Sequence, residues 1–391
     1  MSEKGNGAAF RFVMVLGVVS LLADMTYEAA RSITGPYLGI LGASASVVGV
    51  VAGMGELIGY GMRLVSGIVS DRTQRYWAVT MTGYAVNLLA VPALALAGRW
   101  EVAAVLIMAE RLGKAIRTPA RDALLSHAAH SVGRGWAFGL HEAMDQIGAM
   151  TGPMIVAAVL AWKGRYEYGF AVLAVPAVLA LGALALARSF YPVPRDLEPS
   201  FPMGNARGLQ GTFRLYLAAV AFVALGFADY PLAALHMKTA GVLPDTWIPL
   251  IYAGAMGVDA VAALVFGRLY DKKGFSVLPA MIAVSAWSAP LVFLAGRGAL
   301  VVGMVLWGVG MGAQESIIRA VVADIVPRNR RATGYGIFNT GFGIAWFAGS
   351  ALMGFLYDRS LLALAVFSTA SQLGALPLLM AVGKRLRSPA P

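Results

Sequence analysis

The chain has 391 residues, a length that by itself allows several soluble domains. Its composition excludes them, because 59% of the residues are hydrophobic, against roughly 45–50% in soluble domains, and only 13% are charged, against about 25%. The net charge of +11 does not indicate nucleic-acid binding, since the basic residues lie between apolar runs and form no continuous stripe. The absence of cysteine excludes disulfides, thiolate metal sites and cysteine nucleophiles. We therefore expect an all-α, polytopic membrane protein.

Twelve apolar runs follow one another along the chain. A spanning helix takes ~20 residues, so twelve use about 240 and leave about 150 for connections, too few for a sizeable soluble domain. Barrel strands are excluded, because they are only ~9–11 residues long and alternate in polarity. We expect the first run to be retained, since the start MSEKGNGAAF shows no signal-peptide cleavage site. The expected spans are residues 11–38, 44–70, 76–98, 101–124, 134–161, 166–189, 213–238, 245–270, 275–296, 299–322, 332–356 and 361–383.

The longest polar stretch, residues 191–212, is rich in Pro, Gly and charge and predicts a linker between two halves. The halves are an N-terminal six-helix bundle, 1–190, and a C-terminal six-helix bundle, 213–391. Lys and Arg are enriched in cytoplasmic loops, and the loops and tails on one side hold nineteen of them. We therefore expect a multi-pass protein of the cell (inner) membrane with both termini and the linker in the cytoplasm. The opposite loops hold only Arg99, Lys163, Arg165, Lys238, Arg297 and Arg359.

The two halves repeat one another with an offset of about 200 residues, which predicts two parallel bundles with a site at their interface. Single matches arise by chance, but several in the same order do not. The matches are Gly67-Ile-Val-Ser-Asp71-Arg72 with Gly267-Arg-Leu-Tyr-Asp271-Lys272, Asp24 with Asp229, Glu110 with Glu315, Ile116-Arg117 with Ile318-Arg319, and residues 134–139 with 331–336.

These features resemble the major facilitator superfamily. The loop Gly67–Arg75 is similar to the family's motif A, a Gly and an Asp followed by a basic cluster, and its echo stands between spans 8 and 9. The stretches 110–126 and 135–153 resemble bacterial efflux permeases of the drug–proton antiporter kind. Two positions depart from the motifs: Gln74 replaces a second Gly, and Val156-Ala157 replace a terminal Gly-Gly, which weakens the case for antiport over symport. The resemblance assigns a gating latch to Gly67, Asp71, Arg72, Arg75, Gly267, Asp271 and Lys272, inner-surface partners to Arg117, Arg121 and Asp122, and a motif C to Gly139, Gly148, Gly152 and Pro153.

Physically, the two motif A glycines are expected to allow close helix approach, and exposed ion pairs worth ~0–1 kcal/mol suit a latch that opens in each cycle. The alternative is that these residues only anchor a tight inner loop. The motif C glycines can likewise be packing residues or take part in the conformational change.

Ionisable residues inside the spans are the candidates for function, because each costs at least ~2.5–3.5 kcal/mol on insertion scales unless it faces a partner or a wet cavity. On span 1, Asp24, Glu28 and Arg31 are spaced i, i+4, i+7 and lie within a stripe of about 60°. The expected cavity residues are Asp24, Tyr27, Glu28, Arg31, Glu56, Arg63, Glu110, Arg111, His141, Glu142, Asp145, Asp229, Asp259, Glu315 and Arg319.

The acids concentrate in the first half, so we expect the proton to bind there, on Asp24, Glu28, Glu56 or Asp145, since a carboxyl without a permanent partner can exchange protons. The alternative is that every acid is paired, with Arg31 beside Glu28 or Asp24, and with Glu56–Arg63, Glu110–Lys114 and Glu315–Arg319 pairs.

The sequence therefore predicts a monomeric, proton-coupled antiporter in the lipid bilayer that exports a small organic compound, without cofactor, metal or nucleic acid. No nucleotide-binding loop of the Walker type is present, so the proton gradient is the expected energy source. Proton-coupled uptake of an organic anion or metabolite is the nearer alternative. Metal-ion export, an intramembrane enzyme and a non-transporting receptor are less favoured, because neither a His-x-x-x-His ligand pair nor a catalytic motif is present.

Overall fold

The computed structural model describes the backbone of residues 3–132, 134–191, 211–326 and 331–387. The side chains of these ranges are described except those of 3–9, 71, 126–132, 134–139, 319, 323–324, 331–333 and 387. Within these ranges the chain is helical and contains no strand. The predicted linker 191–212 lies almost entirely outside the described residues, so the predicted domain boundary stays a prediction.

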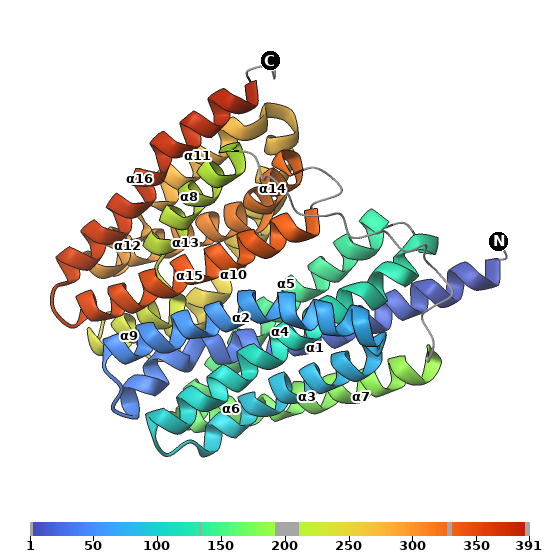
Figure 1. Ribbon diagram of the computed structural model, residues 1–391. Coiled ribbons are helices and arrows are strands. Elements are labelled where there is room, and N and C mark those ends of the chain that lie inside the picture. Colours follow the sequence, from blue (N-terminus) through green and yellow to red (C-terminus); the bar gives the residue numbers. More distant parts are fainter. Residues whose placement is uncertain (1–2, 133, 192–210, 327–330, 388–391) are drawn as a thin grey trace. The chain divides into compact units, whose positions relative to one another are not determined.

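Many of the described helices are long, as the apolar runs predict, while shorter ones share a run, and most are joined by short turns (Figure 1). Their bounds are α1 Glu3–Ile40, α2 Ala45–Thr73, α3 Tyr76–Ala93, α4 Trp100–Val132, α5 Arg134–Lys163, α6 Tyr166–Val172, α7 Ala174–Phe190, α8 Gly211–Gly226, α9 Tyr230–Thr239, α10 Trp247–Lys273, α11 Val277–Ser285, α12 Ser288–Phe293, α13 Arg297–Ala313, α14 Arg319–Ile325, α15 Arg331–Tyr357 and α16 Leu361–Arg387.

By length and composition, ten stretches of the described residues can cross a membrane. One of them, Trp247–Phe293, contains two of the expected spans. Helix α4 is not among the ten, because the charged residues from Glu110 to Arg121 interrupt its apolar run. These two differences account for the twelve expected spans, and the prediction of an all-α polytopic fold is confirmed.

Several expected spans are not regular helices throughout, and two of the irregularities lie beside predicted site residues. The expected span 213–238 is broken at residues 227–229, between α8 and α9, where Asp229 has an extended backbone just before α9. The expected span 299–322 contains a π-helical turn, Gln314–Ile318, between α13 and α14. Such wide turns insert an extra residue into a helix and are frequent at functional sites.

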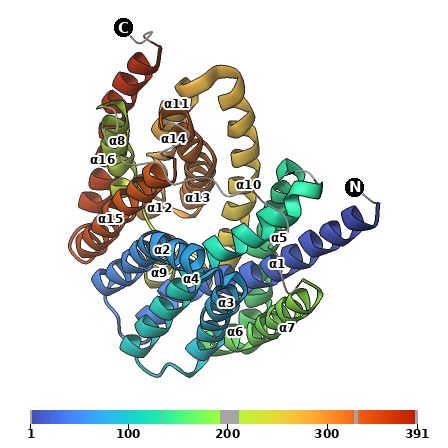
Figure 2. The same ribbon diagram turned by 45° about the vertical axis from the view of Figure 1, so that its right-hand side comes forward.

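By backbone contacts the chain divides into two compact units. The first contains residues 1–37, 62–201 and 245–253, and the second contains residues 38–61, 202–244 and 254–391. In the first unit α3 packs along α4, side by side in both views (Figures 1 and 2). In the second unit α8 packs against α15 and α16.

The sequence repeat extends to helix packing. A Cβ atom added at Gly148 of α5 would meet the backbone of α1, at the carbonyl oxygen of Leu21 and 3.0 Å from Met25 N. In the second unit a Cβ added at Gly349 of α15 would meet the backbone of α8, at the carbonyl oxygen of Leu225. Both contacts join a late helix of a repeat to its first helix at a position where only hydrogen fits.

The motif A loop also has a counterpart in the second half. Gln74 has φ 55° and Gly274, 200 positions later, has φ 65°, so both loops turn through a left-handed residue. The expected close helix approach at the first glycine of each motif is not present. The nearest atom to a Cβ at Gly67 is Pro119 Cβ at 3.7 Å, and Gly267 has nothing within 4 Å.

Candidate functional site

A cluster of buried charged side chains lies in the first unit, around the middle of α1. Asp24 and Glu28 are 7% and 6% exposed, and Tyr27 beside them is also buried. The three residues share a face because a helix advances about 100° per residue. The Tyr27 hydroxyl donates a hydrogen bond to Asp24 Oδ1, which links two of the predicted cavity residues directly.

Helices α3, α4 and α10 supply the partners of two of the acids. Lys114 Nζ lies 3.5 Å from Glu28 Oε1, and the Tyr252 hydroxyl donates a hydrogen bond to Glu28 Oε2. Arg111 Nε lies 3.3 Å from Glu110 Oε2, and Asn87 Nδ2 donates to Glu110 Oε1 at 2.8 Å. The Glu110–Lys114 pair of the alternative interpretation is therefore wrong, and Glu110 is paired with Arg111 instead. The lysine reaches across to α1, because i,i+4 spacing makes an intrahelical pair possible but does not choose between partners.

Asp145 on α5 has two basic neighbours. Its Oδ2 is 3.3 Å from His141 Nδ1 and 3.9 Å from Arg121 Nη1. Arg121 also contacts Asp122 Oδ1 at 2.8 Å and donates to Ser20 Oγ at 3.1 Å. These contacts place Arg121 inside the buried cluster.

Arg117 is 1% exposed, so its side chain is buried within the first unit, and its role as an inner-surface partner stays a prediction. Its guanidinium lies 4.2 Å from the ring centroid of Tyr84 and 5.6 Å from that of Tyr27. Its Nε and Nη1 have no hydrogen-bond partner among the described residues. Aromatic faces stabilise a desolvated guanidinium by up to ~2 kcal/mol, so the two tyrosines hold this charge in place.

Asp24 differs from the neighbouring acids. Among the described side chains, Glu28, Glu110 and Asp145 each have a basic nitrogen within 4.0 Å, whereas Asp24 has only the Tyr27 hydroxyl. The ring of Tyr27 has Lys114 Nζ 3.7 Å from its centroid. The tyrosine therefore stands between the Asp24 carboxyl and a cation of the cluster.

The other predicted site residues are spread along the chain. Arg31, Glu56 and Arg63 are half-buried, Glu142 is exposed, and Asp259 is fully buried in α10. The motif A residues Arg72, Arg75, Asp271 and Lys272 are exposed, and their latch role stays a prediction. Motif C residue Gly152 packs on the backbone of Met25. The side chains of Asp71 and Arg319 and the surroundings of Gly139 lie outside what the structure describes.

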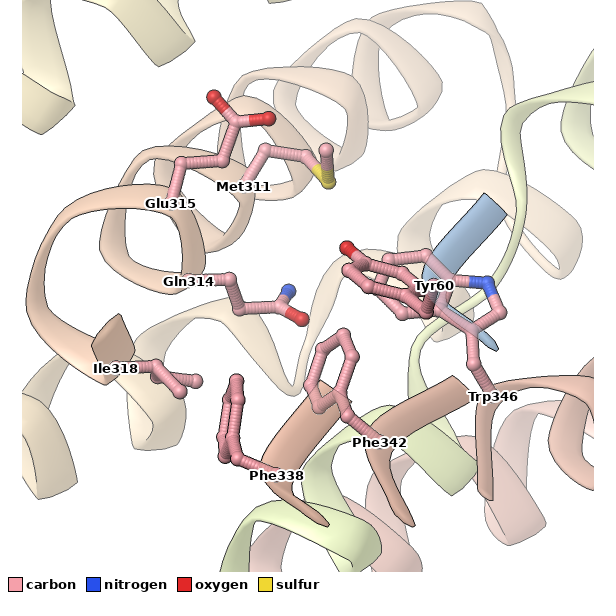
Figure 3. Close-up of a pocket in the computed structure, with 8 residues that line it drawn as sticks. All are labelled: Tyr60, Met311, Gln314, Glu315, Ile318, Phe338, Phe342 and Trp346. Carbon is pink, nitrogen blue, oxygen red and sulfur yellow. The ribbon is translucent and has the colours of Figure 1, made fainter. Parts of the chain in front are cut away.

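The second unit contains a pocket that the sequence did not predict as a whole. The empty space around it is about 330 Å³, but this includes open solvent, and the enclosed part admits only a group about the size of a water molecule. Figure 3 shows Gln314 pointing among aromatic rings, while the Glu315 carboxylate points away from them. Gln314 comes from the π-helical turn of α13–α14 and most of the rings from α15. The lining residues are Tyr60, Met311, Gln314, Glu315, Ile318, Phe338, Phe342 and Trp346.

Asp229 lies behind this pocket and is 2% exposed. It accepts hydrogen bonds from Trp346 Nε1 at 2.9 Å and from the Ser350 hydroxyl. Asp24 and Asp229 occupy matching positions of the repeat, and each accepts a hydrogen bond from an aromatic side chain. Of the pocket, the sequence singled out only Glu315, because a neutral aromatic residue in an apolar helix carries no signal of its own.

Comparison with known proteins shows to which family the chain belongs. The model of the Major Facilitator Superfamily matches residues 16–350 and also 217–389. The chain belongs to the major facilitator superfamily. An uncharacterized transporter of this type from Methanocaldococcus jannaschii is 26% identical over 360 residues, covering 89% of each chain. An uncharacterized protein of Mycobacterium tuberculosis is 45% identical over 384 residues, covering 96% of this chain and 93% of the relative.

Solved structures of the superfamily share the fold at low sequence identity. The nucleoside transporter NupG superposes with a TM-score of 0.70 at 15% identity, covering 97% of this chain and 100% of its own. A POT family transporter in complex with 5-aminolevulinic acid gives a TM-score of 0.75 at 12% identity, covering 97% of each chain. The protein is thus a multi-pass membrane transporter of the superfamily rather than an enzyme.

Proposed function

We propose that this transporter is a proton-coupled antiporter of the cell membrane that exports a small organic compound by alternating access, with both termini in the cytoplasm. The observation that carries the proton coupling is the buried cluster of the first unit, in which Asp24 has a hydroxyl partner but no cation within ion-pair distance among the described side chains. A carboxyl held in this way can bind and release a proton, whereas one held by a cation stays ionised.

The composition of the cluster suits reversible protonation. Asp24, Glu28, Glu110 and Asp145 face the four basic side chains of Arg111, Lys114, Arg117 and Arg121, so the ionised cluster is close to neutral. Protonation of Asp24 leaves one positive charge in excess, and its release restores the balance. Because burying an unbalanced charge is costly, this excess positive charge favours release of the proton.

The geometry also connects Asp24 to α5, the helix that carries the proposed motif C. Gly148 and Gly152 of α5 pack directly on α1 at Leu21 and Met25, on either side of Asp24. A shift of α5 along α1 therefore changes the surroundings of the carboxyl. A membrane potential of 100 mV supplies ~2.3 kcal/mol per charge, which drives a roughly fifty-fold solute gradient per proton.

The experiment is proton flux in proteoliposomes that contain a pH-sensitive dye and this protein alone, tested with a panel of aromatic amines, carboxylates and neutral compounds. We expect at least one compound to cross the membrane in the direction opposite to that of the proton. Asp24→Asn should abolish the proton flux but retain exchange of the compound across the membrane. Glu167→Gln is the matched control, because Glu167 pairs with Arg165 at 3.2 Å on an exposed surface. Proton flux at the parent rate in Asp24→Asn contradicts the assignment.

The second candidate is uptake of an organic anion by proton symport. The observation that favours it is the concentration of Lys114, Arg117 and Arg121 on one helix of the cluster. The same proteoliposomes separate the two, because in symport the compound and the proton enter together.

A further inference from the structure

The pocket of the second unit has a chemistry that selects its ligand. Phe338 and Phe342 are stacked with centroids 5.6 Å apart, and Phe342 meets both Trp346 and Tyr60 edge to face at 5.3 Å. These rings bring four aromatic systems to one small space (Figure 3). The face of an aromatic ring is negative and attracts cations.

The hydrogen-bonding groups in the pocket wall offer an acceptor. Gln314 is 8% exposed, and its Nε2 donates to the carbonyl oxygen of Gly310 at 3.3 Å, which fixes the orientation of the amide. Its Oε1 has no hydrogen-bond partner among the described residues. The indole N–H of Trp346 is already used by Asp229. A buried acceptor without a donor costs about 1–3 kcal/mol, so a ligand N–H at this point is favoured.

The only acidic or basic side chain among the lining residues is Glu315, which adds negative charge at the exposed side of the pocket. Apart from the Tyr60 hydroxyl, the lining therefore offers an anionic ligand only ring faces, a carbonyl oxygen and, outside the rings, a carboxylate, all of which repel it. A protonated amine is attracted by each of them.

We propose that this pocket binds the ammonium group of an organic cation that has an aromatic or alkyl body, with Gln314 Oε1 accepting an N–H hydrogen bond and the rings around Phe342 holding the charge. This inference rests on the proposed export of small organic compounds and names their class. The π-helical turn at residues 314–318 is the backbone feature that brings Gln314 into the pocket.

The test is calorimetric titration of the purified full-length protein in detergent, where no proton gradient is needed. The probes are 4-phenylbutylammonium, its neutral analogue 4-phenylbutanol, its anionic analogue 4-phenylbutyrate, and the trimethylammonium analogue, which has the charge but no N–H. We expect the ammonium to bind at least tenfold more tightly than the alcohol and the carboxylate. The trimethylammonium probe should bind more weakly than the ammonium, by the contribution of one hydrogen bond.

The variants assign the binding to this pocket. Gln314→Met should weaken ammonium binding about tenfold and leave the trimethylammonium probe unchanged, because a hydrogen bond to a charged donor is worth about 1.5–3 kcal/mol. Phe342→Ala should weaken both cations. Glu315→Gln should weaken both by about threefold at low salt and less at high salt, since exposed charges are screened. Phe355→Ala is the matched control, an exposed ring of the same helix, beside Arg359.

Two results overturn the inference: an alcohol or carboxylate that binds as tightly as the ammonium, or equal effects of Gln314→Met on both cations. Size-exclusion profiles identify a variant that has failed to fold, and Gln314→Met, which keeps the side-chain volume, decides the matter if Phe342→Ala fails. If no amine binds but other compounds drive proton flux, this inference is rejected and the proposed proton coupling is not. Amine binding without any proton flux rejects the proton coupling alone.

Discussion

Gln74 has a backbone φ of 55°, in the left-handed region that costs an L-residue roughly 1–2 kcal/mol. The equivalent position of the second repeat is Gly274, which adopts φ 65° without a side-chain penalty. We therefore predict that Gln74→Gly stabilises the protein by up to about 1 kcal/mol, the strain relieved less the added freedom of the unfolded chain. Thermal unfolding in detergent, followed by circular dichroism, measures the change in Tm.

The control for this prediction is Thr73→Gly, one residue earlier and still within α2. Glycine at a helical position costs about 1 kcal/mol, so this variant should have a lower Tm. A lower Tm for Gln74→Gly as well indicates that contacts of the Gln74 side chain outweigh its backbone strain.

At the residue scale, the sequence predicted which charged residues lie together better than it predicted their partners. The stripe of Asp24 and Glu28 follows from helical periodicity alone, and the structure brings both into one cluster with Glu110 and Asp145. The partner of Lys114 is instead decided by how α4 packs on α1. The distance between α4 and α1 depends on the tertiary structure, and it cannot be predicted from the spacing of residues along one helix.

At the scale of elements, two glycine contacts join the first helix of each repeat to the helix that crosses it. Ala at Gly148 would press on the backbone of α1 near Asp24, and Ala at Gly349 would press on α8 at Leu225. We predict that each substitution destabilises the protein by about 1–3 kcal/mol, the usual cost of overpacking. Gly148→Ala should also lower transport, because it displaces the segment that carries the proposed proton site.

Unfolding temperature and proteoliposome flux measure these two effects. Gly182→Ala in α7 is the control, since a Cβ at that position has nothing within 4 Å. It should leave flux unchanged and raise the Tm slightly, because alanine is the better helix former. Equal stability of Gly148→Ala and Gly182→Ala contradicts the tight crossing.

The positions of the spans follow from hydropathy, but the irregular turns inside them do not. The break at residues 227–229 and the π-helical turn at 314–318 lie within apolar runs that read as continuous helices. Both are close to buried polar groups, Asp229 and Gln314. Beside the break, the carbonyl oxygens of Gly226 and Ala228 accept hydrogen bonds from Ser368 Oγ at 2.6 Å and Trp307 Nε1 at 2.8 Å. At the π-helical turn Gln314 Nε2 donates to the carbonyl oxygen of Gly310, so side chains replace the lost helical bonds. A polar residue in an apolar run was the available signal, although it does not say in which direction the helix bends.

At the scale of the whole molecule, the sequence repeat predicted the superfamily fold. The repeat can be recognised because a few positions, those that packing constrains most, keep the same residue in both halves. The pocket of the second unit has no visible counterpart in the repeat, since its rings are ordinary apolar residues of a spanning helix. Function that depends on such residues is found only when the helices are assembled.

One contact joins a helix of the first repeat to a helix of the second at the end of α2 opposite to Gln74. Asp358, just after α15, accepts hydrogen bonds from the backbone N–H groups of Ala45 and Ser46, at 3.2 and 2.8 Å, and from the Ser46 hydroxyl at 2.5 Å. A carboxylate at a helix N-terminus is favoured by the helix dipole and by the free N–H groups. If the two repeats separate at this end of α2 during alternating access, the contact between Asp358 and the start of α2 must break.

We predict that a short bismaleimide joining Ser46→Cys to Asp358→Cys stops transport, because it prevents the two helix ends from parting. The chain has no cysteine of its own, so the label reaches only the two introduced thiols. Proteoliposome flux before and after cross-linking gives the result, with Arg99→Cys and Glu101→Cys as the control pair. Arg99 Nη2 and Glu101 Oε1 lie 3.0 Å apart on exposed side chains at the start of α4. Linking these two positions should leave flux unchanged, since both lie at the same end of one helix. Flux at the parent rate in the linked Ser46→Cys/Asp358→Cys protein shows that α2 and α15 stay joined throughout the cycle, and that the opening to this side occurs between other helices.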